Sequence, residues 1–103
     1  MYTKLVIFRN ELKNRNVSRY KLIGIITELI MSKEIFEKNK DISVFMQDIF
    51  GVTIKDCILK SRSQIMAYTC RIILSHEDFE NKDKLLKFIN LKIDEFQAKG
   101  KVR

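Results

Sequence analysis

The residues best suited to chemistry are four cations near the N-terminus, Lys13, Arg15, Arg19 and Lys21, with asparagines interleaved and Tyr20 adjacent. Lys and Arg side chains bind phosphate oxygens, amides add hydrogen bonds to a sugar–phosphate backbone, and an aromatic ring can stack on a base. We call these four residues the N-terminal basic turn and expect it to bind phosphate groups. The alternative is a solvated turn whose charges only keep the protein soluble.

Nucleophiles and metal ligands are too sparse for a catalytic or metal site. Cys57 and Cys70 are thirteen residues apart with no CxxC pair, and His76 is the single histidine, so four zinc ligands cannot be assembled without carboxylates. The neighbouring pair Ser75 and His76 lacks the arrangement of a nucleophile and its base, and we interpret His76 as a residue at a helix start. We therefore expect no enzyme, no metal and no cofactor.

The charge balance favours a polyanionic partner. Twenty Lys and Arg against thirteen Asp and Glu give a formal net charge of +7 and a pI near 9.5. Residues 1–21 contribute +5, residues 22–41 contribute −1, residues 42–74 contribute +2 and residues 75–103 contribute +1. Because Lys and acidic residues alternate near the C-terminus, we interpret the last helix as an ordinary charged surface and do not assign it to nucleic acid.

The 103 residues suffice for one domain, and we expect a single domain over 1–103 with residues 101–103 as a frayed tail. Residues 1–8 lack the long apolar region and cleavage site of a secretory signal. The most apolar stretch, Leu22 to Met31, is ten residues long and contains Glu28, whereas a spanning helix needs about 20 residues. We expect a cytoplasmic protein without a membrane segment.

Helical spacing of apolar residues and the near absence of Gly and Pro predict an all-α fold, a compact bundle of five to six helices with a helix-turn-helix-like core. The run Leu5 to Phe8 is also compatible with a short strand. Helices are predicted at 3–13, at 18–31 with Ser18 as N-cap, and as a short piece at 33–37. A further helix follows an N-cap at Asp41 and ends at Gly51, and the next extends from Thr53 to about Lys60. The last two are predicted at 64–74 and at 83–99, the latter with Gly100 as cap, and a small turn is predicted at 75–78. Thr53 and Asp56 have the spacing of a capping box, and Gly24 within an apolar stripe suggests close approach of another backbone.

A second set of cations lies in and after this core, at Lys55, Lys60, Arg62 and Arg71. The segment 49–53, then Asp56 and 59–63, resembles the opening of the C-terminal DNA-binding domain of the bacterial replication initiator DnaA. That resemblance covers about residues 42–74 and implies a short helix, a basic loop and a long helix, in which Lys60 and Arg62 match the basic loop and Arg71 lies near a basic position. The family's second signature, a Gly-Arg-Asp-His-Thr-Thr type segment, has no counterpart after Ser75, and there is no phosphate-binding loop.

These patterns favour a small nucleic-acid-binding regulator, with duplex DNA as the preferred target and a phage, plasmid or other mobile element as a plausible source. Its site would comprise the N-terminal basic turn and the second set of cations. Neutralising about five phosphates would give a log–log salt slope of roughly −4 to −5. The alternative is a protein-interaction module, an inhibitor or adaptor that presents an apolar helix face. The sequence leaves a homodimer open.

Overall fold

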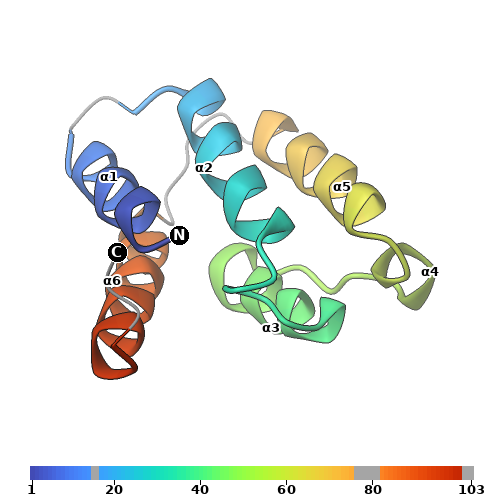
Figure 1. The fold of residues 1–103 in the computed structure, drawn as a ribbon. Coiled ribbons are helices and arrows are strands. Elements are labelled where there is room, and N and C mark those ends of the chain that lie inside the picture. The colour runs from blue at the N-terminus through green and yellow to red at the C-terminus, as the bar shows by residue number, and fades with distance from the viewer. Residues whose placement is uncertain (15–16, 76–81, 101–103) are drawn as a thin grey trace. The chain divides into compact units, whose positions relative to one another are not determined.

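The computed structural model describes residues 1–14, 17–75 and 82–100, and these residues form six helices and no strand (Figure 1). The all-α prediction is confirmed, and the run Leu5 to Phe8 is helical. The helices are α1 (Tyr2–Leu12), α2 (Arg19–Met31), α3 (Asn39–Phe50), α4 (Asp56–Leu59), α5 (Arg62–Ser75) and α6 (Lys82–Ala98).

The chain divides into two compact units, and each is described by itself. One unit combines Met1–Val17 with Glu80–Arg103 and therefore contains α1 and α6; the other is Ser18–Phe79 and contains α2 to α5. The single domain expected over 1–103 stays a prediction.

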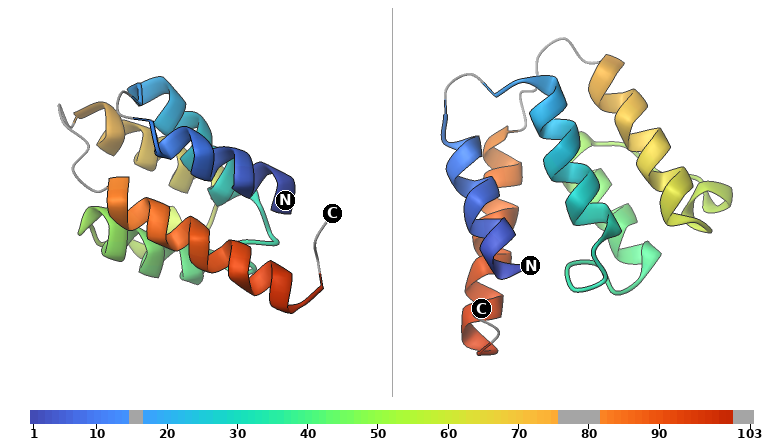
Figure 2. Two further views of the ribbon diagram at one scale, coloured as in Figure 1. Left: turned by 90° about the vertical axis from the view of Figure 1, so that its left-hand side faces the viewer. Right: turned by 45° about the horizontal axis from the view of Figure 1, so that its top comes forward.

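In the first unit α1 and α6 pack side by side and antiparallel (Figure 2). Gln97 Nε2 donates a hydrogen bond to Tyr2 Oη at 2.9 Å, and at the other end Lys82 Nζ donates to the carbonyl of Asn14. The buried apolar residues recur at helical spacing: Leu5 and Leu12 on α1; Leu85, Ile89, Ile93 and Phe96 on α6. A pair of amphipathic helices from opposite ends of the chain thus forms one core.

In the second unit α2 packs against α5 (Figure 1). All five residues of the predicted α2 stripe are buried: Leu22, Ile25, Ile26, Leu29 and Ile30. On α5 the buried residues are Ile65, Thr69 and Ile73, and Thr69 Oγ1 lies 3.7 Å from Met46 Sδ on α3. The Thr69 hydroxyl is satisfied locally because it donates to the Ile65 carbonyl at 2.8 Å.

Three predicted helix ends are confirmed. Ser18 Oγ accepts from the Lys21 amide at 3.2 Å, which satisfies a backbone donor that the helix itself leaves without a partner. Gly51 and Gly100 follow α3 and α6 with φ of +67° and +69°, a conformation that costs glycine little.

Four local predictions are wrong. Residues 33–35 form a turn instead of a helix. Asp41 lies inside α3, where its side chain accepts from the Lys38 amide at 3.3 Å, so the helix begins earlier than expected. The Thr53 hydroxyl donates to Gln47 Oε1 at 3.1 Å and caps no helix; α4 is a single turn whose N-cap is Lys55. Helix α5 begins at Arg62 instead of residue 64.

The small turn predicted at 75–78 stays a prediction, because the residues after Ser75 lie outside the described part of the chain.

The expectation for Gly24 is also wrong. In the described part of the chain, a Cβ atom placed on Gly24 would meet no atom within 4 Å apart from its chain neighbours and the nearby backbone of its own helix, and the residue is exposed. No other backbone lies within that distance.

We predict that Gly24→Ala stabilises the protein by about 1 kcal/mol, because alanine has lower conformational entropy in the unfolded chain and fits the helix. Such a gain corresponds to a rise in Tm of roughly 4–8 °C in thermal unfolding followed by circular dichroism. The matched control is Gly51→Ala, which should destabilise by about 1–2 kcal/mol because its φ of +67° strains an L-residue. A loss of stability in Gly24→Ala would show that the space beside this residue is occupied.

Candidate nucleic-acid interface

The residues of the N-terminal basic turn belong to two different units. Lys13 is the exposed C-cap of α1 in the first unit, whereas Arg19 and Lys21 lie in the first turn of α2 in the second unit. Arg15 falls outside the described residues. Of these four cations, Arg19 and Lys21 are the pair that the structure places in one element.

Arg19 lies next to the end of α5. Arg19 Nη1 donates to the Leu74 carbonyl at 3.4 Å, and Arg71 lies one turn before Leu74. The carbonyls in the last turn of a helix lack intrahelical partners and carry the negative end of the helix dipole, so the guanidinium is well placed there. Folding therefore brings the last turn of α5 next to Arg19, which is about fifty residues away in the sequence.

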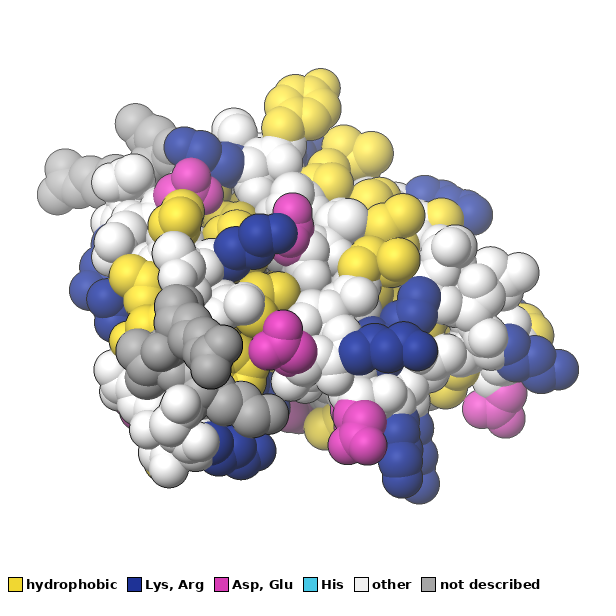
Figure 3. Space-filling view, in the orientation of Figure 1, with side chains coloured by type: hydrophobic (Ala, Val, Ile, Leu, Met, Phe, Trp, Pro, Cys, Tyr) yellow, Lys and Arg dark blue, Asp and Glu magenta, His cyan; other side chains and the backbone are white. Residues whose placement is uncertain are grey.

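This neighbourhood also exposes apolar surface. Tyr20 is 81% exposed and Leu74 is 51% exposed. We call the five residues Arg19, Tyr20, Lys21, Arg71 and Leu74 the α2–α5 patch. Figure 3 shows hydrophobic side chains over the upper ends of α2 and α5 with Lys and Arg side chains beside them. An exposed ring among cations is the combination that binds phosphates and stacks on bases.

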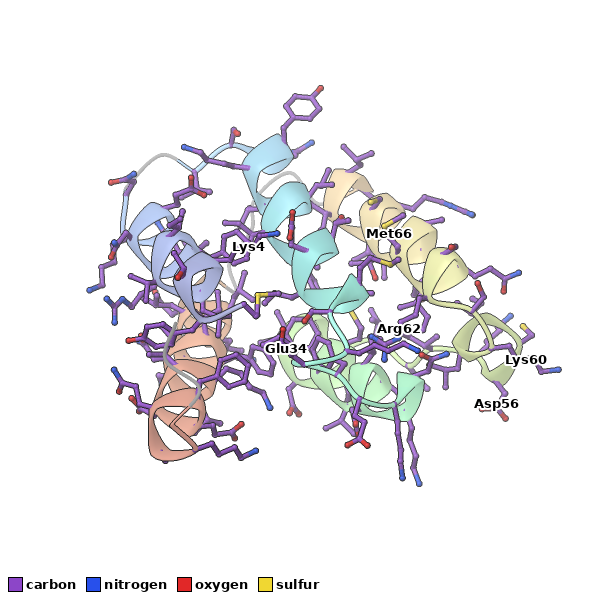
Figure 4. The ribbon with its side chains drawn as sticks, in the orientation of Figure 1. Lys4, Glu34, Asp56, Lys60, Arg62 and Met66 are labelled. Atoms are coloured by element: carbon purple, nitrogen blue, oxygen red, sulfur yellow. The ribbon has the colours of Figure 1, made fainter. Side chains whose placement is uncertain are left out.

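Lys55 and Lys60 bracket α4, as its N-cap and C-cap, and both are exposed. Lys60 points away from the body of the second unit in Figure 4 and directly precedes α5. Asp56 lies on the same short helix and offsets part of their charge. The distance from Lys60 to Arg71 along α5 is about 15 Å, so these lysines and the α2–α5 patch lie toward opposite ends of that helix.

Arg62 has a different role from the one expected. Its side chain points from the start of α5 toward α3 and the turn before it (Figure 4). Nε donates to Asn39 Oδ1 at 2.6 Å, Nη1 donates to the Ile30 carbonyl at 2.6 Å, and Nη2 donates to the Phe36 carbonyl. Since the three nitrogens of the guanidinium all donate to internal acceptors, Arg62 holds the fold together, and we remove it from the candidate interface.

Asn39 completes this cluster and was missed at the sequence level. Its Nδ2 donates to the Leu59 carbonyl at 2.6 Å while its Oδ1 accepts from Arg62. We call Arg62 and Asn39 with their acceptors the Arg62 clamp. Asn39 lies between two lysines in a polar stretch, which is typical of a surface loop, so no sequence signal separated it from its neighbours.

The two units differ in charge. Met1–Val17 with Glu80–Arg103 contains eleven Lys and Arg against five Asp and Glu, a formal charge of +6, and Ser18–Phe79 contains nine against eight, a formal charge of +1. Lys84 and Lys87 are exposed and three residues apart on α6, so they share its outer face. The interpretation of α6 as an ordinary charged surface stays a prediction, and its lysines belong to the unit that carries +6.

Comparison with known proteins adds no assignment, since no protein-family model, curated protein or solved structure matches this chain. Within residues 1–14, 17–75 and 82–100, no three His, Cys, Asp or Glu side chains are grouped so that they could hold a metal ion. In the same part of the chain, no helix is long and apolar enough to cross a membrane.

We predict that Arg62→Lys lowers the free energy of unfolding by about 2–4 kcal/mol, because an ammonium group cannot replace the planar fork and leaves carbonyl groups without donors. Urea unfolding followed by circular dichroism measures this loss. The matched control Arg71→Lys changes an exposed arginine of the same helix and should stay within about 0.5 kcal/mol of the parent. Equal effects of the two variants would contradict the clamp.

Proposed function

We propose that this chain is a small basic regulator that binds nucleic acid, with duplex DNA as the favoured target. The observation that carries the proposal is the α2–α5 patch, in which Arg19, Lys21 and Arg71 accompany a tyrosine that is 81% exposed. The cations would contact phosphates, and the ring would pack against sugar or base.

The charge of the first unit supports this function. With +6 on Met1–Val17 and Glu80–Arg103, that unit adds a long-range attraction to any polyanion and raises the rate of encounter. Lys13, Lys84 and Lys87 are its exposed candidates for phosphate contacts. Lys55 and Lys60 would add contacts near the start of α5.

The resemblance to the DnaA DNA-binding domain points in the same direction and stays a proposal. In its favour, Lys60 is exposed before a long helix, as a residue of the basic loop would be. Arg62 departs from that role because its side chain is used inside the unit. The resemblance therefore supports the class of partner but supplies only one of the two expected loop contacts.

The test is fluorescence anisotropy of the full chain with a random DNA duplex, an RNA duplex and a single strand, each titrated across salt. We expect the DNA duplex to bind most tightly, with a log–log salt slope of about −4, because each neutralised phosphate contributes about −0.9. A dissociation constant weaker than about 10⁻⁴ M at physiological salt would overturn nucleic-acid binding and favour the alternative, a protein-interaction module. Exposed Ile7, Val44 and Leu91 are the candidate contacts for such a partner.

We further predict that the double variant Lys21→Glu with Arg71→Glu weakens duplex binding at least tenfold and makes the salt slope shallower by roughly 2, since two positive charges close to the phosphates are removed. The matched control is Lys33→Glu with Lys40→Glu, which makes the same change of net charge at exposed positions of the same unit outside the patch. The control should retain the parental slope to within about 1. Equal losses in both double variants would mean that net charge alone, and not the α2–α5 patch, carries the binding.

A further inference from the structure

Helix α5 has one face buried and the opposite face open to solvent. Ile65, Thr69 and Ile73 are buried, and Thr69 Oγ1 lies 3.7 Å from Met46 Sδ on α3, so this face packs inside the second unit. The exposed positions follow the spacing of a single helical face: Ser63, Gln64, Ala67, Arg71, Leu74 and Ser75. We call these six residues the outer face of α5.

The outer face lacks acidic groups. Each of the other five helices in the described part of the chain contains at least one Asp or Glu, whereas α5 contains none over its fourteen residues. A helix that approaches DNA closely meets phosphates on both sides, so a carboxylate on it would be repelled. The composition of α5 is therefore suited to a polyanion at close range.

Two side chains of the outer face can form paired hydrogen bonds with base edges. The Gln64 amide matches the N6 and N7 atoms of adenine, and the Arg71 guanidinium matches the O6 and N7 atoms of guanine. They are seven residues and two turns apart, about 10 Å along the axis, which corresponds to about three base pairs. Ala67 lies between them, and its small side chain permits a close approach of the helix or contact with a thymine methyl group.

Cations flank this face at both ends. Lys60 precedes the first turn of α5, and Arg19 contacts the Leu74 carbonyl beside the last turn. Fourteen residues span about 21 Å, which exceeds the roughly 12 Å width of the major groove, so cations at the two ends can reach phosphates on its two walls.

From these observations we propose that the outer face of α5 enters the major groove of duplex DNA and that Gln64 and Arg71 read base edges there. The inference rests on the proposed function, since it requires that the protein binds duplex DNA. It adds sequence selectivity to that function and gives the phosphate contacts a positioning role.

The first arm of the test asks whether α5 lies against DNA. Ala67→Glu places a carboxylate at the centre of the outer face, and Ala98→Glu makes the same change at an exposed alanine at the end of α6. Both proteins should retain the parental circular dichroism. We expect Ala67→Glu to weaken duplex binding at least tenfold more than Ala98→Glu.

The second arm asks whether α5 reads sequence. Selection of the full chain against a random duplex library yields a preferred site, and anisotropy then compares that site with a scrambled duplex. Gln64→Ala should reduce the preference by about five- to a hundredfold with an unchanged salt slope, because the lost group is uncharged. Gln47→Ala, at an exposed glutamine of α3, should leave the preference unchanged. Lys60→Ala should weaken both duplexes equally and make the slope shallower by about 0.9.

The outcomes separate the two proposals. Absence of salt-dependent duplex binding by the parent protein overturns the proposed function and this inference with it. Duplex binding that responds alike to Ala67→Glu and Ala98→Glu overturns the placement of α5 alone. Selection without a preferred site, or a preference unaffected by Gln64→Ala, overturns base reading by α5 while nucleic-acid binding stands.

Discussion

The second unit depends on the hydrogen bonds of one guanidinium. Arg62 begins α5 and joins it to the end of α2 through the Ile30 carbonyl, to the following turn through the Phe36 carbonyl and to the start of α3 through Asn39. Asn39 extends the network to the end of α4 through the Leu59 carbonyl. Carbonyls at a helix end and in a turn lack regular partners, and this fork of donors satisfies them together. The start of α5, and with it the position of the outer face, is determined by these bonds.

A second arginine makes the corresponding contact at the other end of the same helix pair. Arg62, at the start of α5, donates to a carbonyl near the end of α2, and Arg19, at the start of α2, donates to a carbonyl near the end of α5. Because the two helices are antiparallel, each places a cation at the negative end of its partner's dipole. The two sites differ in burial: Arg62 donates three part-buried hydrogen bonds, whereas Arg19 makes one long exposed bond and is followed by exposed Tyr20 and Lys21. The same chemistry therefore stabilises the fold at one end of the pair and leaves the exposed residues Tyr20 and Lys21 beside Arg19 at the other.

Local signals in the sequence predicted most helix positions, and the error in the role of Arg62 comes from long-range contacts. The apolar stripe from Leu22 to Ile30 and the αL glycines at 51 and 100 depend on neighbours within a few residues, so their patterns were sufficient. Thr53 had the spacing of a cap, but its hydroxyl bonds to Gln47 instead. Arg62 was placed in the interface because exposure was inferred from its polar surroundings; its acceptors lie 23 to 32 residues away along the chain. The sequence alone does not contain the information that Asn39 and two backbone carbonyls will meet there.

The distribution of charge between the two units is a second property that the order of residues along the chain does not predict. Summed along the chain, the positive excess is N-terminal, and α6 looks nearly balanced; once α1 pairs with α6, their unit carries +6 and the other unit +1. Non-specific attraction to a polyanion scales with the number of cations, whereas selectivity requires groups that match base edges. The unit with most of the charge would therefore supply attraction, and the nearly neutral unit, with its acid-free α5, would supply selection. Under this proposal, loss of cations from α1 or α6 would lower the affinity and leave the preferred site unchanged, whereas loss of the uncharged Gln64 from α5 would remove the preference and leave the affinity for other duplexes.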